Sequence, residues 1–165
     1  DLSARCQAED ADASLLLCVP VARQLKERIR SERGLTATIG IASNKLLAKI
    51  ASDFEKPDGL TVVSERDKVQ FLRPLPARVL YGVGRVTEQV LLGAGIRTVG
   101  DLQDYGGDLR ALVGSFGPKL KQSALGEDDR PLSSRRMNVQ RETLNFQRST
   151  SDHQPSAIDH QPTGP

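Results

Sequence analysis

The stretch from Thr36 to Gly59 constrains the fold of this chain more than any other. A run of β-branched and small residues at 36–41 predicts a buried strand. Ser43 and Asn44 are residue types that cap the start of a helix. The helix predicted after them carries a large apolar residue at every fourth position, which gives it one apolar face: Leu46, Ile50 and Phe54. The sequence therefore predicts a strand followed by a helix that packs back onto it.

A second face of the same helix is charged. Lys45, Lys49 and Asp53 share the four-residue spacing, and Lys56 follows just after the helix. A row of lysines beside the end of a strand suits a polyanion, because the ammonium groups attract phosphate and the long stems give reach. The same row can also be only a solvated helix face, which is the more common explanation of such a pattern. It is not a P-loop, since no G-x-x-x-x-G-K-[ST] string is present.

The elements around this stretch indicate an α/β arrangement. A helix is expected from Pro20, at its first position, to about Glu32, and a second strand at Leu60–Val63. The order helix–strand–helix–strand is typical of α/β folds. Ser64 and Asp67 then resemble a capping box for a short helix ending near Leu72. Two prolines follow, and we place a domain boundary there, so that a first domain covers residues 1–75.

The next segment, residues 76–132, is expected to be helical and rich in glycine. Gly82, Val83 and Gly84 form a G-x-G turn between two predicted helices, with Arg85 directly after it. Glycines in such a turn let the backbone approach another surface, and the free N–H groups of the next helix attract anions. This is the physics of a helix-hairpin-helix that holds a DNA phosphate without reading sequence. A lone G-x-G can also be only a turn. Further along, Gly95 suits the end of a helix with Ile96 as its apolar contact, and Thr98–Asp101 suits a capping box.

Composition narrows the possible functions. The 165 residues carry a net charge of only +2, so any binding to nucleic acid must come from local patches. No apolar run approaches the roughly 20 residues that span a membrane.

Residues 133–165 have little periodicity and read as a disordered tail; their histidines, His153 and His160, could alternatively suggest a metal tract. The only methionine is Met137, and the chain reads as a piece of a longer protein.

The strings TIGIASNKLLAKIASDFEKPDG and LYGVG, in this order, closely resemble the Y-family DNA polymerases, in particular their DinB branch. The resemblance runs from about Asp1 to about Leu132. It implies a partial palm at 1–75, an all-α helix-hairpin-helix thumb at 76–132, and a linker or disordered tail at 133–165. The family usually has proline where this chain has Tyr81, so the turn is expected to differ slightly here.

The resemblance also implies a function, which is DNA synthesis across damaged template bases with Mg²⁺ as the cofactor. The metal-binding acidic pair of the family matches positions just before Asp1, so no catalytic and no metal-binding residue is assigned here, and the chain alone is expected to be inactive. Lys56 matches the lysine that contacts the incoming triphosphate, and Lys45 and Lys49 match basic positions near the nucleic acid and the nucleotide site. The thumb hairpin that holds the duplex backbone matches Gly82, Val83 and Gly84, next to Arg85.

The partners implied in the same way are primer–template DNA, a deoxynucleoside triphosphate and, for a full-length protein, a sliding clamp. The location implied is the bacterial cytoplasm near the nucleoid, with no membrane. Two other possibilities stay open: a non-catalytic DNA-binding module or polymerase relic, and an α/β protein that never meets DNA. Salt-dependent DNA binding separates the last from the others.

Overall fold

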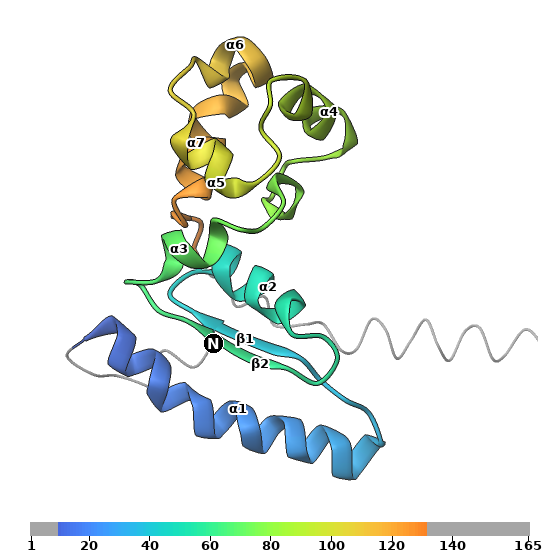
Figure 1. Ribbon diagram of the computed structural model, residues 1–165. Helices are drawn as coiled ribbons and strands as arrows, with labels where there is room; N and C mark the ends of the chain where they lie inside the picture. The colour runs from blue at the N-terminus through green and yellow to red at the C-terminus, as the bar shows by residue number, and fades with distance from the viewer. Residues whose placement is uncertain (1–9, 132–165) are drawn as a thin grey trace, which may run out of the picture. The chain divides into compact units, whose positions relative to one another are not determined.

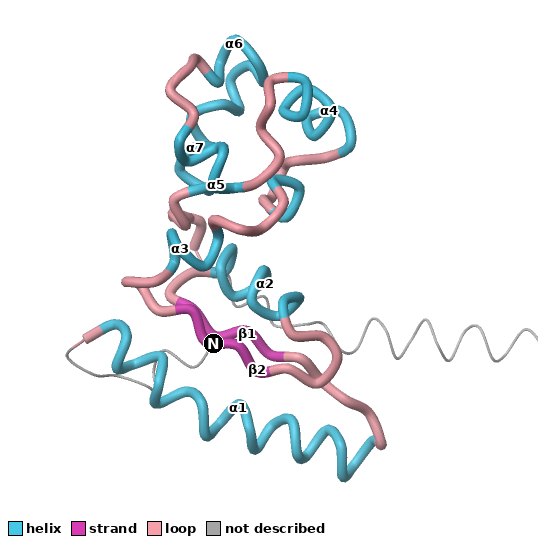
Figure 2. Tube along the Cα trace, in the orientation of Figure 1, coloured by secondary structure: helices cyan, strands magenta, loops and turns pink. Residues whose placement is uncertain are grey.

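The computed structural model describes residues 10–131, which form one small sheet and a series of helices (Figure 1). In chain order the elements are α1 (Ala11–Arg33), β1 (Ile39–Ala42), α2 (Lys45–Phe54), β2 (Leu60–Val63), α3 (Lys68–Leu72), the 3₁₀ turn η1 (Ala77–Val79), α4 (Arg85–Gly93), α5 (Val99–Asp104), α6 (Leu109–Val113), the 3₁₀ turn η2 (Gly114–Phe116) and α7 (Gly117–Ala124). Figure 2 shows both strands in the first half of this region, followed by helices joined by short loops. The α/β beginning and the helical continuation are therefore confirmed.

The two strands pair in parallel, with Ile39 opposite Leu60, and α2 connects them. Ile41 on one face of the sheet packs against Leu15 and other residues of α1. On the opposite face, Val63 packs against the apolar side of α2. The sheet thus lies between α1 and α2, as Figure 1 shows. The second strand begins and ends where the sequence predicted, whereas β1 begins at Ile39 and not at residue 36.

The first helix corrects the sequence prediction, because α1 begins at Ala11 and runs through Pro20. A proline inside a helix removes one backbone hydrogen bond and disfavours the turn before it. Here the buried side chains of Leu15 and Cys18 before the proline, and of Ala22 after it, all pack against the sheet. Their burial holds both halves of the helix on one surface, and this outweighs the local preference of Pro20.

The helix α2 begins as predicted, since the side chain of Asn44 accepts a hydrogen bond from the Leu47 N–H at 3.0 Å. Its apolar face differs from the prediction at one end. Leu46 and Ile50 are buried, but Phe54 is 52% exposed. Phe54 is the last residue of the helix and makes an edge contact with Phe71, with ring centroids 5.2 Å apart. The residues that complete the buried face are Leu47 and Ala51.

The segment before α3 also differs from its prediction. The Asp67 N–H does donate to the Ser64 hydroxyl at 3.0 Å, but the helix begins only at Lys68. The pair therefore closes a turn ahead of the helix. After the prolines, the Ala77 N–H donates to the Arg97 carbonyl at 3.0 Å. The 3₁₀ turn η1 then leads into the hairpin, where the sequence predicted a helix before the turn.

Buried residues from both predicted domains share one hydrophobic cluster. It joins Leu47 of α2 and Val63 of β2 to Leu91 of α4 and Leu120 of α7. The boundary at residues 75 and 76 stays a prediction, as do the bounds 1–75 and 76–132. The predicted tail at 133–165, with His153 and His160, lies outside the described residues.

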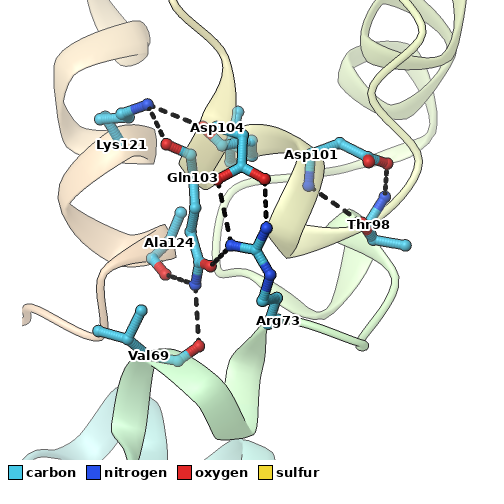
Figure 3. A network of polar contacts seen from close by, with 9 residues as sticks. Val69, Arg73, Thr98, Asp101, Gln103, Asp104, Lys121 and Ala124 are labelled. Atoms are coloured by element: carbon cyan, nitrogen blue, oxygen red, sulfur yellow. Dashed lines mark hydrogen bonds and ion pairs between the residues drawn. The ribbon is translucent and has the colours of Figure 1, made fainter.

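A polar network also links the helices on the two sides of the prolines (Figure 3). The Gln103 amide donates to the carbonyls of Val69 and Ala124, at 3.0 and 2.8 Å. The Arg73 guanidinium pairs with both carboxylate oxygens of Asp104. Together these contacts tie α3 to α5 and α7.

Two helix ends of the second half match the sequence prediction. The Ile96 N–H donates to the Leu91 carbonyl and the Gly95 N–H to the Leu92 carbonyl, at 2.9 and 3.0 Å, which is the pattern of a Schellman motif. At the start of α5, the Thr98 hydroxyl accepts from the Asp101 N–H at 3.1 Å, and the Asp101 carboxylate accepts from the Thr98 N–H at 2.8 Å. Hydrogen bonds from the backbone N–H groups of Thr98 and Arg97, and then the Thr98 hydroxyl, hold the pKa of Asp101 below its usual value.

Replacing Thr98 with alanine is expected to lower the free energy of unfolding by about 1 kcal/mol, because the substitution leaves the Asp101 N–H without its cap. Urea denaturation followed by circular dichroism measures this change. Thr98→Ser keeps the hydroxyl and serves as the control, with a loss expected to be much smaller. Equal losses for the two variants would show that the Thr98 methyl group, and not the cap, carries the effect.

Candidate nucleic-acid interface

The predicted lysine row contains an acid at its centre. Asp53 binds Lys49 through one carboxylate oxygen, at 3.3 Å, and Lys56 through the other, at 2.5 Å. The side chains of the two lysines are 76% and 61% exposed. Hydrogen bonds from Lys56 and then Lys49 lower the pKa of Asp53, so this carboxyl is ionised at neutral pH. Asp53 therefore joins two predicted phosphate-binding residues and partly neutralises them.

Lys56 lies in the loop between α2 and β2. A second lysine, Lys26 of α1, holds this loop against α1. Lys26 lies 3.1 Å from a carboxylate oxygen of Asp58 and donates to the Gly59 carbonyl at 3.0 Å. The side chain of Lys26 is only 16% exposed. These contacts fix the backbone just after Lys56 while its ammonium group stays on the surface.

Lys45, at the first position of α2, contacts the segment that follows α7. We call this segment, residues 126–131, the return segment, because it runs back to the start of α2. The Lys45 ammonium donates to the Pro131 carbonyl at 2.8 Å. The Asn44 amide donates to the Gly126 carbonyl at 2.8 Å. The start of α2 therefore holds both ends of the return segment.

The predicted hairpin forms a tight turn in which the Val83 N–H donates to the Leu80 carbonyl at 3.1 Å. Gly82 has φ of +91°, a conformation that side chains disfavour. Gly84 is the N-cap of α4, and it is exposed together with Arg85. The first N–H groups of α4 have no acceptor within the helix. Val83 is buried, at 9% exposure, and anchors the turn.

A cleft separates α2 from the approach to this hairpin. One hollow of about 530 Å³ is lined by residues that include Lys49, Asp53, Arg78 and Tyr81. An adjoining hollow of about 270 Å³ shares Lys49 and Tyr81 and adds Lys45 and Arg130. Basic side chains thus outnumber the single acid among the charged residues of the lining. The cleft has the charge to receive a polyanion.

The structure brings only some of the predicted site residues to this cleft. Lys45 and Lys49 line the cleft. Lys56 is not among the lining residues, but it binds Asp53, which is. The predicted hairpin residues, 82–85, follow directly after Tyr81 and lie outside the lining.

Sequence reasoning missed four residues of this region: Asp53 as a partner of the lysines, and Arg78, Tyr81 and Arg130 as lining residues. The signal for Asp53 was present in the four-residue spacing. No local pattern indicates Arg130, because the return segment brings it to the cleft from far along the chain.

The donor set for a metal ion can be tested on the same residues. Within residues 10–131, no three side chains of histidine, cysteine, aspartate or glutamate gather closely enough to hold an ion. This part of the chain therefore does not fit a Mg²⁺ site. None of the helices in the described part of the chain has the length and apolar character needed to cross a bilayer.

Comparisons with known proteins point to one family. A family model described as the impB/mucB/samB family matches residues 1–53. A DNA polymerase IV of Stenotrophomonas maltophilia is 47% identical over 117 residues, which is 70% of this chain and 32% of that protein. A DNA polymerase IV of a Marinomonas species is 41% identical over 119 residues, 70% of this chain and 33% of that protein.

Solved structures give the same answer. DinB from Sulfolobus solfataricus superposes with a TM-score of 0.63 at 29% identity, over 72% of this chain and 36% of that one. A Y-family polymerase chimera, Dbh-Dpo4(243-245)-Dbh, reaches a TM-score of 0.67 at 27% identity, over 81% of this chain and 38% of the chimera. The chain spans about a third of the length of the curated relatives that it matches.

Proposed function

Because this chain is a homologue of the Y-family DNA polymerase IV, the DinB branch, over about a third of the length of those proteins, we propose that it supplies part of the palm and the thumb of a translesion DNA polymerase. The observation that carries the proposal is the cleft whose lining contains the predicted lysines Lys45 and Lys49 on one side and the approach to the hairpin on the other. A strand of DNA carries a negative charge at every phosphate, so it can lie along a cleft that is lined by basic side chains.

The proposed roles follow the positions of the groups. Lys45 and Lys49 would lie near the DNA backbone, and the N–H groups of the hairpin at Gly82–Gly84, with Arg85, would hold a phosphate. Lys56 would contact the triphosphate of the incoming nucleotide, for which it must leave Asp53. In this proposal, residues 1–75 belong to the palm and 76–132 to the thumb.

Mg²⁺, a deoxynucleoside triphosphate and a sliding clamp are proposed for the full-length protein, acting in the bacterial cytoplasm. The acidic pair of the family matches positions before Asp1. A polypeptide of these 165 residues is therefore proposed to bind primer–template DNA without extending it. Primer extension in the presence of Mg²⁺ tests this, and incorporation of a nucleotide by residues 1–165 alone would overturn it.

The binding test uses the whole chain and a labelled primer–template at several salt concentrations. Weak binding that is independent of sequence and falls steeply with salt is expected. Lys45→Glu with Lys49→Glu should weaken binding at least about tenfold and lower the slope of log affinity against log salt by about 2. Asp53→Asn should tighten binding about two- to fivefold, because it removes the acid that neutralises Lys49 and Lys56.

The matched control is Arg28→Glu with Arg33→Glu, which makes the same charge change on α1. That helix lies across the sheet from α2, and the Arg28 side chain is 74% exposed. This control should change binding by less than about threefold, since exposed charges farther apart than the Debye length of about 10 Å are largely screened. Equal losses for both double variants would indicate attraction by net charge alone and would contradict the proposed cleft.

A further inference from the structure

Tyr81 stands out in the cleft because it is a large aromatic side chain that is 65% exposed. It lies in the turn that the Val83 N–H closes by donating to the Leu80 carbonyl, and the ring of Phe116 lies close to Gly82 in the same turn. The position of Tyr81 is therefore set by the hairpin, although most of its ring is open to solvent. An exposed ring on a rigid turn is a surface on which a planar ligand can stack.

Arg130 of the return segment supports this ring. Its guanidinium carbon lies 4.4 Å from the centre of the Tyr81 ring, as in a cation–π contact. Asp128 also holds the guanidinium, accepting from Nε at 2.6 Å and from Nη2 at 2.8 Å. The side chain of Asp128 is only 3% exposed, and the pKa of its carboxyl is lowered by Arg130. Arg130 is thus held in place before any ligand arrives.

We propose that Tyr81 and Arg130 form a stacking platform for an unpaired nucleobase of a DNA strand that lies in the cleft. This inference rests on the proposed function and adds a preference for strands with unstacked bases. The platform adjoins Lys45 and Lys49, which line the same hollow, so one nucleotide can place its base on the ring and its phosphate near a lysine. Aromatic rings and arginine planes beside a basic groove are the usual means of binding single strands.

The charge of the lining favours nucleic acid over an apolar peptide as the occupant. Lys45, Lys49, Arg78 and Arg130 contribute four basic groups to the linings of the two hollows. The acid among the lining residues is Asp53, in the larger hollow, and Arg130 is paired with Asp128 outside the lining. The lining also has an apolar part, which includes Leu46, Ile50 and Val79, but an apolar peptide helix would leave the basic groups beside it without partners. A strand satisfies both the basic groups and the aromatic surface.

The chain offers a direct probe for this contact, because it has no tryptophan and only two tyrosines, Tyr81 and Tyr105. In the full chain carrying Tyr105→Phe, Tyr81 is the only tyrosine that fluoresces. Oligothymidylate is expected to quench this fluorescence, whereas an abasic oligomer of the same length should bind by its phosphates and quench much less.

Affinity measurements with the same two oligomers complete the test. Tyr81→Ala should weaken binding of oligothymidylate about tenfold and binding of the abasic oligomer less than about twofold, with the salt slope unchanged. Tyr81→Phe should keep the affinity of the parent chain. Arg130→Lys keeps the positive charge but loses the planar guanidinium that stacks on the Tyr81 ring. It should therefore weaken only the binding of oligothymidylate.

The outcomes separate this inference from the proposed function. If the parent chain binds neither oligomer nor duplex at low salt, the proposed function fails. If it binds them with the expected salt dependence, but Tyr81→Ala weakens both oligomers equally or neither, only the platform is overturned. Absence of quenching by oligothymidylate while it is bound would also overturn the platform.

Discussion

Gly40→Ala is expected to lower the free energy of unfolding by about 3 kcal/mol, because β1 and α2 touch at this glycine through their backbones. A Cβ atom on Gly40 would lie 2.2 Å from the Ala48 carbonyl oxygen and 2.5 Å from the Ser52 nitrogen. Backbone atoms inside a helix cannot rotate away as the end of a side chain can. The helix must therefore move off the strand, and the buried contacts of Leu47 and Ala51 would loosen with it.

Urea denaturation monitored by circular dichroism measures this loss, and Gly93→Ala is the matched control. Gly93 ends α4, its φ is not positive, and a Cβ there would meet no atom within 4 Å. The control should be neutral or stabilising by up to about 1 kcal/mol, since alanine suits a helix better than glycine. An unchanged midpoint for Gly40→Ala would mean that α2 can shift at little cost, contrary to the close contact described.

Gly82→Val is expected to damage both the hairpin and the binding of DNA. The φ of +91° disfavours any β-branched residue, which alone costs about 1–2 kcal/mol. A Cβ atom at Gly82 would also lie 2.5 Å from the tip of the Phe116 ring. The turn would open, the first N–H groups of α4 would move, and primer–template affinity should fall at least about tenfold, as the loss of several phosphate contacts implies.

Three further variants separate the causes of this effect. Gly84→Ala adds a methyl group where no atom lies within 4 Å, so stability should hold within about 0.5 kcal/mol. Affinity for DNA should still fall in Gly84→Ala if a phosphate approaches the turn as proposed. Gly82→Ala with Phe116→Leu should recover part of the stability lost by Gly82→Ala alone, since it removes the clash but not the backbone strain. If Gly84→Ala binds DNA as well as the parent chain, the backbone of the hairpin is not the phosphate-binding group.

The sequence by itself determined those features whose hydrogen bonds close within a few residues. The Asn44 cap, the capping box of Thr98 and Asp101, and the Gly95–Ile96 helix end were all predicted and are present. The bounds of β2 were also predicted. Each of the three helix ends depends on a residue type and on neighbours at most five positions away, so the local string contains the whole cause. The strand β2 differs, because its residue types indicated its bounds while its hydrogen bonds are made with β1.

Only the tertiary structure decided the features that depend on distant burial or on distant partners. The helix α1 passes through Pro20 because Leu15, Cys18 and Ala22 bury against the sheet, and no local rule contains that gain. Arg130 meets the ring of Tyr81 because contacts from the start of α2 hold the return segment in place. Burial and ion pairing act between whichever groups the fold brings together, and a linear sequence does not state which groups these are.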